Sequence, residues 1–324
     1  MRRIKLLEVR SELGAGTRGA SLGVDALRVA CLNKGSDYFR RFNSVSVPDQ
    51  NQVLFDRNHF PKAKHIDSVY TVLKGIAGAV EQTLRFGEFP LVLAGDHSNA
   101  AGTIAGIKAA YPYKTLGVVW VDAHADIHSP YTTPSGNMHG MPLAISLGDD
   151  NRECQRNHVE PETEFFWQKL KNLGEPGPKV TGDHLVYVVV RDTEHEEDAI
   201  IDRLGIKNYK LDEVKAKGTR QVAREIYERL RFCDIVYISF DVDSLDSRFS
   251  KGTGTPVEQG LNVEEAISLC RALLDNERVV CFEMVEINPT LDNMNTMATN
   301  AFDILEAATD AIQNRLRMEE VVSR

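Results

Sequence analysis

Six short apolar runs, rich in Val, Ile and Leu, constrain most strongly what this chain can fold into. They cover residues 4–9, 90–94, 116–121, 185–190, 235–240 and 279–285. Near-continuous apolar runs of this length are typical of strands buried on both faces of a parallel sheet. Between the first two runs, Val69, Val72, Ile76 and Val80 recur at helical spacing and predict an amphipathic crossover helix that ends before Gly87.

A further helix is predicted over residues 296–315, and helical patterns follow most of the runs. Strands that alternate with helices predict a three-layer α/β/α fold, with helices on both faces of a parallel sheet. The chain shows no internal repeat, low-complexity tract or long linker. We therefore expect a single domain over residues 1–324.

The net charge, the apolar content and the cysteine spacing limit the classes of protein to which this chain can belong. A net charge of -9 at pH 7 argues against a nucleic-acid binder, which would carry a basic face. No run approaches the roughly 20 apolar residues of a membrane span, and the N-terminus lacks the apolar stretch of a signal peptide. The five cysteines form no CxxC pair, so reduced thiols, buried in the case of Cys233 and Cys281, and a cytoplasmic location are expected.

Polar residues follow four of the apolar runs, where open α/β sheets place their ligands. Residues two apart in an extended backbone point to the same side, so closely spaced Asp and His residues converge there. Glu286 follows the last run, and the six candidate metal ligands follow three others: His97, Asp122, His124, Asp126, Asp241 and Asp243.

These four carboxylates and two imidazoles suit hard or borderline divalent ions. So many carboxylates at one place would repel one another unless cations lie between them. A single Asp or His at a strand end is more often a helix cap or a structural group. Three strand ends that carry such residues together favour a metal site.

Three segments resemble the signatures of the ureohydrolase family, which includes arginases, agmatinases and formimidoylglutamases. In chain order they read Gly95-Asp96-His97-Ser98, Asp122-Ala123-His124-Ala125-Asp126 and Ser239-Phe240-Asp241-Val242-Asp243. Residues 136–140, 254–256 and 286–289 support the match, which is most similar to a divergent branch of bacterial arginases. The resemblance implies a central, mostly parallel eight-stranded sheet and hydrolysis of the L-arginine guanidinium to L-ornithine and urea.

The resemblance also implies two divalent metal ions, with manganese as the usual metal and cobalt as the alternative. One ion would be held by His97, Asp122, Asp126 and Asp241. The other would be held by His124, Asp122, Asp241 and Asp243, with Asp122 and Asp241 bridging. A water held between two such ions becomes a hydroxide near neutral pH and can attack the guanidinium carbon.

Three residues are candidates for catalysis. Asp126 is placed to accept the proton of the attacking water and pass it to the leaving amine. His139 resembles the family histidine that shuttles protons; the alternative is a loop histidine without chemistry. Glu286 ends an apolar strand, where a carboxylate needs a cation beside it. In arginases the equivalent glutamate pairs with the substrate guanidinium, and the alternative is a structural salt bridge with an arginine such as Arg191.

Residues 128–137 resemble the arginase loop that contacts the amino-acid end of arginine, which makes Ser135 and Asn137 candidate binding residues. Thr255, in the Gly-Thr-Pro segment, is another. The chain departs from the common arginase pattern at two positions, where His128 replaces Asn and Glu194 replaces Asp. His128 can still donate to a carboxylate, and Glu194 can reach an α-ammonium. L-Arginine is the first choice, with agmatine, formimidoylglutamate and other guanidino acids as alternatives.

Two other classes of protein compete with this interpretation. Gly14, Gly16 and Gly19 spell GxGxxG, the pattern of an NAD-binding oxidoreductase, but Asp37 does not end the second strand that such a site requires. A non-catalytic metal-binding protein is the third class, and the full set of ligands together with His139 and Glu286 disfavours it. The resemblance implies a homo-oligomer, trimer or hexamer, that acts on a small guanidino molecule.

Overall fold

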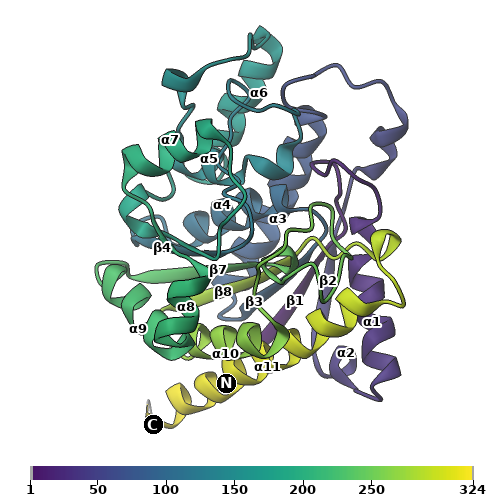
Figure 1. The fold of residues 1–324 in the computed structure, drawn as a ribbon, viewed down its shortest axis with the longest axis vertical. Helices are drawn as coiled ribbons and strands as arrows, with labels where there is room; N and C mark the ends of the chain where they lie inside the picture. Colours follow the sequence, from purple (N-terminus) through teal and green to yellow (C-terminus); the bar gives the residue numbers. More distant parts are fainter. Residues whose placement is uncertain (1–2, 323–324) are drawn as a thin grey trace.

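One all-parallel sheet forms the centre of the fold (Figure 1). The computed structural model describes residues 3–322, so the end residues 1–2 and 323–324 of the predicted domain lie outside it. The sheet order is β2-β1-β3-β8-β7-β4-β5-β6, and every neighbouring pair is parallel. The strands are β1 (Ile4–Val9), β2 (Asn43–Val47), β3 (Phe89–Ala94), β4 (Leu116–Val121), β5 (Leu185–Val188), β6 (Lys207–Tyr209), β7 (Ile235–Asp241) and β8 (Val279–Val285).

Helices cover both faces of the sheet, as predicted. Two clusters of buried apolar side chains, one on each face, hold the three layers together. One face carries α3 (Ile66–Arg85), α4 (Ala100–Ala110), α5 (Pro142–Leu147), α6 (Pro161–Lys171) and α7 (His195–Leu204). The other carries α1 (Gly23–Asn33), α2 (Tyr38–Arg41), α8 (Leu211–Lys217), α9 (Thr219–Arg229), α10 (Val263–Leu274) and α11 (Thr296–Val322).

All six predicted strands are present, and three of them have the predicted bounds. The two strands that the apolar runs did not reveal, β2 and β6, lie at the two edges of the sheet. β2 is mostly exposed and reads Asn-Ser-Val-Ser-Val, while β6 has three residues. An edge strand has one neighbour and little buried surface, so it lacks the apolar run that marks a central strand.

Both predicted helices are present, and the end of the second needs a correction. The predicted crossover helix is α3, whose apolar side chains are buried against the sheet. The last helix, α11, runs beyond the predicted end at residue 315 and reaches Val322. Cys31, Cys154, Cys233 and Cys270 are free thiols, and Cys233 and Cys281 are buried as expected. Among residues 3–322, no helix combines the length and apolarity needed to cross a bilayer.

Gly95 draws three strand ends together above the sheet. Its amide donates to the carbonyl of Val9 at the end of β1, and its carbonyl accepts from the amide of Glu286 after β8, both at 2.8 Å. A Cβ atom on Gly95 would lie 2.2 Å from the Ser11 carbonyl oxygen, so any side chain would push this junction apart.

We predict that Gly95→Ala destabilises the protein by about 1–3 kcal/mol, because the backbone atoms it would meet have no rotamer to change. Gly78→Ala is the matched control, since Gly78 lies on the exposed side of α3 with nothing within 4 Å of its added Cβ. The control should be neutral or gain about 0.5–1 kcal/mol. Urea unfolding of the metal-free proteins measures both values. Equal stability of the two variants would contradict this account of Gly95.

Candidate metal centre and active site

The six predicted metal ligands come together at the carboxyl ends of β3, β4 and β7. His97 lies in a short turn after β3, and Asp241 is the last residue of β7. Five of the six are nearly fully buried: His97 and Asp122 are 0% exposed, and the exposed fractions of Asp126, Asp241 and Asp243 are 7% or less. The His124 side chain is 21% exposed. Three segments far apart in sequence therefore deliver their polar side chains to one dry place.

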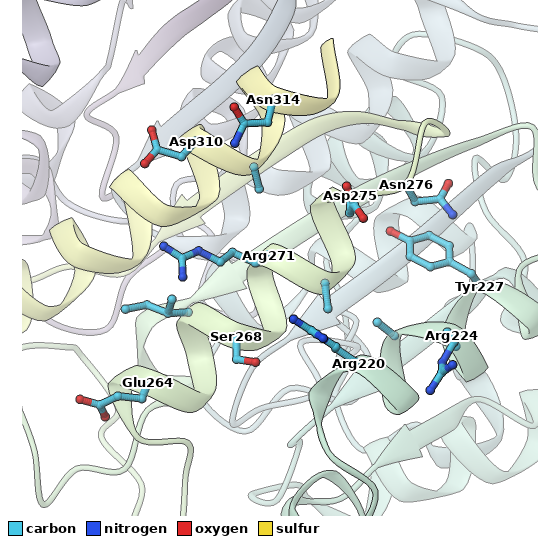
Figure 2. Close-up of a pocket in the computed structure, with 14 residues that line it drawn as sticks. Arg220, Arg224, Tyr227, Glu264, Ser268, Arg271, Asp275, Asn276, Asp310 and Asn314 are labelled. Atoms are coloured by element: carbon cyan, nitrogen blue, oxygen red, sulfur yellow. The ribbon is translucent and has the colours of Figure 1, made fainter. Parts of the chain in front are cut away.

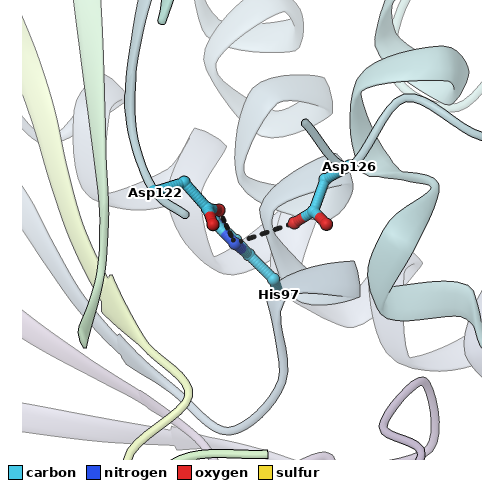
Figure 3. Close-up of side chains that lie close together, drawn as sticks. All are labelled: His97, Asp122 and Asp126. Atoms are coloured by element: carbon cyan, nitrogen blue, oxygen red, sulfur yellow. Dashed lines mark ion pairs between the residues drawn. The ribbon is translucent and has the colours of Figure 1, made fainter. Parts of the chain in front are cut away.

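His97 lies at the centre of the first ligand group. Its Nδ1 atom is 2.9 Å from Oδ2 of Asp122, 3.0 Å from Oδ2 of Asp126 and 3.1 Å from Oδ2 of Asp241. Figure 3 shows Asp122 and Asp126 reaching the same ring nitrogen from opposite sides. Nδ1 has no hydrogen-bond partner of good geometry. One nitrogen cannot hydrogen-bond three carboxylates at once, so this arrangement fits a cation at their centre.

His124 lies at the centre of the second group. Its Nδ1 atom is 2.9 Å from Oδ2 of Asp243 and 3.5 Å from Oδ1 of Asp122. Asp122 thus faces His97 with one oxygen and His124 with the other, which suits the predicted bridging role. Oδ2 of Asp241 faces His97 in the first group, and its Oδ1 accepts the backbone amide of Asp243 at 2.7 Å.

The crowded carboxylates hold protons more tightly than exposed ones. Burial and the charge of Asp122 raise the pKa of Asp243 to about 6, and burial with the charges of Asp243 and Asp122 raises that of Asp241 well above its ordinary value. Burial also acts on Asp122, but the close imidazoles of His124 and His97 bring its pKa below the usual range. Divalent cations would take the place of these protons, and nitrogen and oxygen donors of this kind fit them.

Glu286 and His139 form a separate pair beside the ligands. Glu286 follows β8, is 3% exposed and accepts the His97 amide on Oε1 at 2.9 Å. Nδ1 of His139 lies 3.4 Å from the same oxygen. Burial alone would lower the pKa of His139, but the hydrogen bond with Glu286 and its charge raise it to about 9. The cation beside Glu286 is therefore His139.

The alternative partner for Glu286, Arg191, is wrong. The Arg191 guanidinium donates instead to the backbone carbonyls of Val189, Asp243, Leu245, Val257 and Glu258. Arg191 therefore ties together the loops behind the metal ligands.

The predicted substrate-binding residues line the same cavity, whose volume is about 300 Å³. Nε2 of His128 lies 2.9 Å from Oε2 of Glu194, which caps the N-terminus of α7. The side-chain oxygen of Asn137 accepts a hydrogen bond from Lys64 at 2.8 Å. The backbone amide of Asn137 donates to the Ser135 hydroxyl. Thr255 donates to the ligand Asp243 at 3.3 Å, so it also contacts the metal centre.

Glu197 is a lining residue that sequence reasoning missed. It is 4% exposed, and its Oε2 lies 3.8 Å from Nε2 of His128. Burial raises the pKa of Glu197 to about 8, whereas the hydrogen bond from His128 lowers that of Glu194 to about 2. Glu194 and Glu197 form a capping box at the start of α7. The Glu-x-x-Glu spacing before a helix was the available signal.

The GxGxxG segment packs against the site and leaves no room for a dinucleotide. A Cβ on Gly14 would lie 2.6 Å from Asp96, and one on Gly16 would lie 2.6 Å from Asn137. The Gly14 amide also donates to Asp96 at 2.9 Å. Asp37 precedes α2 rather than ending a strand. The glycines thus allow close approach of protein to protein, which removes the basis for the NAD-binding alternative.

A second hollow lies away from the sheet edge, between α9, α10 and α11 (Figure 2). Its side chains include Arg220, Arg224 and Arg271 together with acidic residues, and all three arginines are exposed. None of the residues that line it is a histidine or a predicted site residue. This hollow therefore offers none of the candidate chemistry found at the strand ends.

Known proteins are similar to this chain in both fold and sequence. The family model "Arginase family" matches residues 2–309. The chain is 33% identical to the arginase of Bacillus subtilis (strain 168) over 308 residues, which are 94% of this chain and 96% of that one. It is 34% identical to the arginase of Brevibacillus brevis over 309 residues, with 94% and 96% covered.

A solved structure shows the same relationship in three dimensions. The native arginase from Bacillus caldovelox superposes with a TM-score of 0.82 at 33% identity, covering 95% of this chain and 98% of that one. With the sheet order, the ligand groups at the strand ends and a match along nearly the whole length, the chain belongs to the arginase family.

Proposed function

We propose that this chain hydrolyses the guanidinium group of L-arginine, which gives L-ornithine and urea. The observation that carries the proposal is the position of His97 Nδ1 within 3.1 Å of three carboxylates, one of which also faces His124. Relatives named arginase, about one-third identical to this chain along nearly its whole length, support the choice of substrate.

Two divalent cations fit the donor set, and we assign manganese with cobalt as the alternative. His97, Asp122, Asp126 and Asp241 would hold one ion, and His124, Asp122, Asp241 and Asp243 the other. When bound, such ions acidify a water molecule and stabilise the negative charge that develops during its attack on a planar carbon.

Asp126 and His139 are the residues that accept and donate protons in the proposed reaction. Burial and the neighbouring charge of Asp122 raise the pKa of Asp126, so this carboxylate accepts a proton from the attacking water more readily than an exposed one. His139, whose pKa is about 9, is protonated at neutral pH and can donate to the leaving amine. Its side chain is 20% exposed, which gives the proton a route to solvent.

Glu286 provides the negative charge for the guanidinium. The His97 amide and His139 both approach its Oε1 atom. Its Oε2 atom faces Gly254, which has no side chain to cover it. A cationic guanidinium in this position gains a charge-assisted hydrogen bond in a site from which water is largely excluded.

The amino-acid end of the substrate lies farther out, between the loop at residues 128–137 and the start of α7. We assign Ser135, Asn137 and His128 to the α-carboxylate, since each has a donor there. Glu194 is the partner for the α-ammonium, with Thr255 completing the wall of the cavity. We also propose one catalytic domain over residues 1–324 and a cytoplasmic homo-oligomer, trimer or hexamer; the free thiols of Cys31, Cys233 and Cys270 suit a reducing compartment.

Urea release tests the substrate. After preincubation with manganese or cobalt, the protein should release urea from L-arginine faster than from agmatine or guanidinobutyrate, which lack part of the amino-acid end. Faster turnover of agmatine would reject arginine as substrate and retain guanidinium hydrolysis. No urea from any of the three would favour a non-catalytic metal-binding protein.

Two variants separate metal binding from guanidinium binding. Asp241→Ala removes a shared ligand, so elemental analysis should find fewer than two ions per chain and urea release should be lost. Glu286→Gln keeps the acceptor for the His97 amide and should retain both ions. Loss of its charge should lower kcat/KM by roughly 10- to 150-fold, the value of a hydrogen bond to a charged group. A Glu286→Gln protein without metal would contradict this division of roles.

The affinity of the protein for divalent metal ions should decrease as the pH is lowered. Because the pKa of Asp243 is raised to about 6, this ligand is protonated below that pH in the metal-free protein and must lose its proton to bind. Each pH unit below 6 should therefore weaken manganese binding by about tenfold for each proton displaced. Calorimetric titrations at about pH 5 and about pH 7 measure the difference. Equal affinities at the two values would refute the assignment of Asp243.

A further inference from the structure

We propose that Asp96 is a positioning residue for His139, because it connects the loop that carries His139 to the turn that carries His97 through the backbone of Gly14. The inference rests on the proposed function in taking His139 as the proton donor. Asp96 is 0% exposed and does not line the cavity, so it acts on the reaction only through its neighbours. The proposal also gives a role to the glycine-rich segment at residues 14–19.

The two carboxylate oxygens of Asp96 bind different parts of the chain. Oδ1 accepts the backbone amide of Ser98 at 2.8 Å and caps the short turn that contains His97. Oδ2 accepts the backbone amide of Gly14 at 2.9 Å, from a residue 82 positions away in the sequence. Both donors are backbone amides, so the direction of each hydrogen bond is fixed. One buried side chain therefore connects the turn after β3 to the loop after β1.

The loop after β1 in turn holds the residues around His139. The Gly14 carbonyl accepts the backbone amide of His139 at 3.1 Å. Gly16 lies against the side chain of Asn137, since a Cβ atom on Gly16 would be 2.6 Å from Nδ2 of Asn137. Residues 14–16 therefore contact both the backbone of His139 and the side chain of Asn137, two residues before it.

These contacts form a closed ring with the contacts of Glu286. Oε1 of Glu286 accepts the backbone amide of His97 at 2.9 Å and lies 3.4 Å from Nδ1 of His139. Asp96 is bonded to His97 along the chain and reaches the backbone of His139 through Gly14. Both the backbone and the imidazole of His139 are thus held relative to the same turn. Without the contact between Asp96 and Gly14, only the contact with Glu286 would remain on this path.

Residue type at both positions fits this role. Capping the turn needs one acceptor, which Ser, Thr or Asn would also supply. Two backbone amides need two acceptor oxygens, and only a carboxylate offers both, because the amide group of Asn would present a donor to one of them. Gly14 must lack a side chain, since its Cβ atom would lie 2.6 Å from Oδ1 of Asp96. The second oxygen of Asp96 and the missing side chain of Gly14 therefore serve the same connection.

Asp96→Asn tests the proposal, because it keeps the size of the side chain and removes one of the two acceptors. The metal-free proteins are transferred to heavy water, and mass spectrometry follows deuterium uptake in the peptides that cover residues 12–16 and 138–140. Both peptides should exchange roughly tenfold faster in the variant, since a hydrogen bond to a charged group is lost and the two loops open more often. This measurement depends on neither metal nor substrate.

A double-mutant cycle on urea release from L-arginine separates positioning from general destabilisation. With manganese-loaded protein, Asp96→Asn should lower kcat by roughly 10- to 100-fold, the effect of misplacing a reacting group by about 1 Å. Its KM should stay within about threefold of the wild-type value. His139→Ala should lower kcat at least as much. Adding Asp96→Asn to His139→Ala should cause no further loss, because no imidazole is left to position.

Asn262→Ala is the matched control. The side-chain oxygen of Asn262 also caps a helix by accepting a backbone amide, that of Glu265 at 2.8 Å, but this cap begins α10, away from the cavity. The control should keep the wild-type kcat and the wild-type exchange of both peptides. If Asp96→Asn does not fold, Gly14→Ala takes its place with the same expectations, since its Cβ atom would press on the Asp96 carboxylate.

Wild-type exchange of both peptides in Asp96→Asn would overturn the inference. So would single effects on kcat that multiply in the double variant, a wild-type kcat in His139→Ala, or an equal loss of activity in Asn262→Ala. A wild-type protein that releases no urea would instead overturn the proposed function. In that case the exchange rates would still decide whether Asp96 holds the two loops together, so the two failures are distinguishable.

Discussion

The concentration of carboxylates around two imidazoles, in a place closed to water, is the constraint on which the rest of the structure depends. Asp122, Asp126 and Asp241 all approach one nitrogen of His97, and none is more than 7% exposed. Such a group is tolerable only if protons or cations neutralise it. The all-parallel sheet makes the group possible, because it brings the ends of β3, β7 and β4 to the same edge.

The position of β8 follows from the same constraint. β8 lies between β3 and β7 in the sheet, so Glu286 emerges in the middle of the ligand-bearing strands. Asp126 and Glu286 both have positive φ, 49° and 68°, which costs on the order of 1–3 kcal/mol for each such residue. Backbone hydrogen bonds hold them there: the Asp126 carbonyl accepts from Leu143, and the Glu286 amide donates to Gly95. The fold thus keeps strained residues where the chemistry needs them.

Periodicity and residue type predicted the central strands and the candidate ligand residues that meet at their ends, because both depend on local pattern. Buried strands need unbroken apolar runs, and ligands need Asp or His at spacings of two. The edge strands β2 and β6 bury too little to leave such a pattern. Arg191 was an alternative partner for Glu286 because of its charge alone. In the structure its guanidinium donates instead to five backbone carbonyls.

The candidate hydrolytic groups and the candidate substrate-binding groups lie on different parts of the fold, which affects how the substrate specificity of such an enzyme can change. The hydrolytic groups sit at strand ends fixed by the sheet, while His128 and Glu194 belong to loops that meet across the mouth of the cavity. Loops tolerate substitution better than the core does. Substitutions at the loop positions alone can therefore change which molecule the cavity accepts. The residues at the strand ends stay the same when this happens.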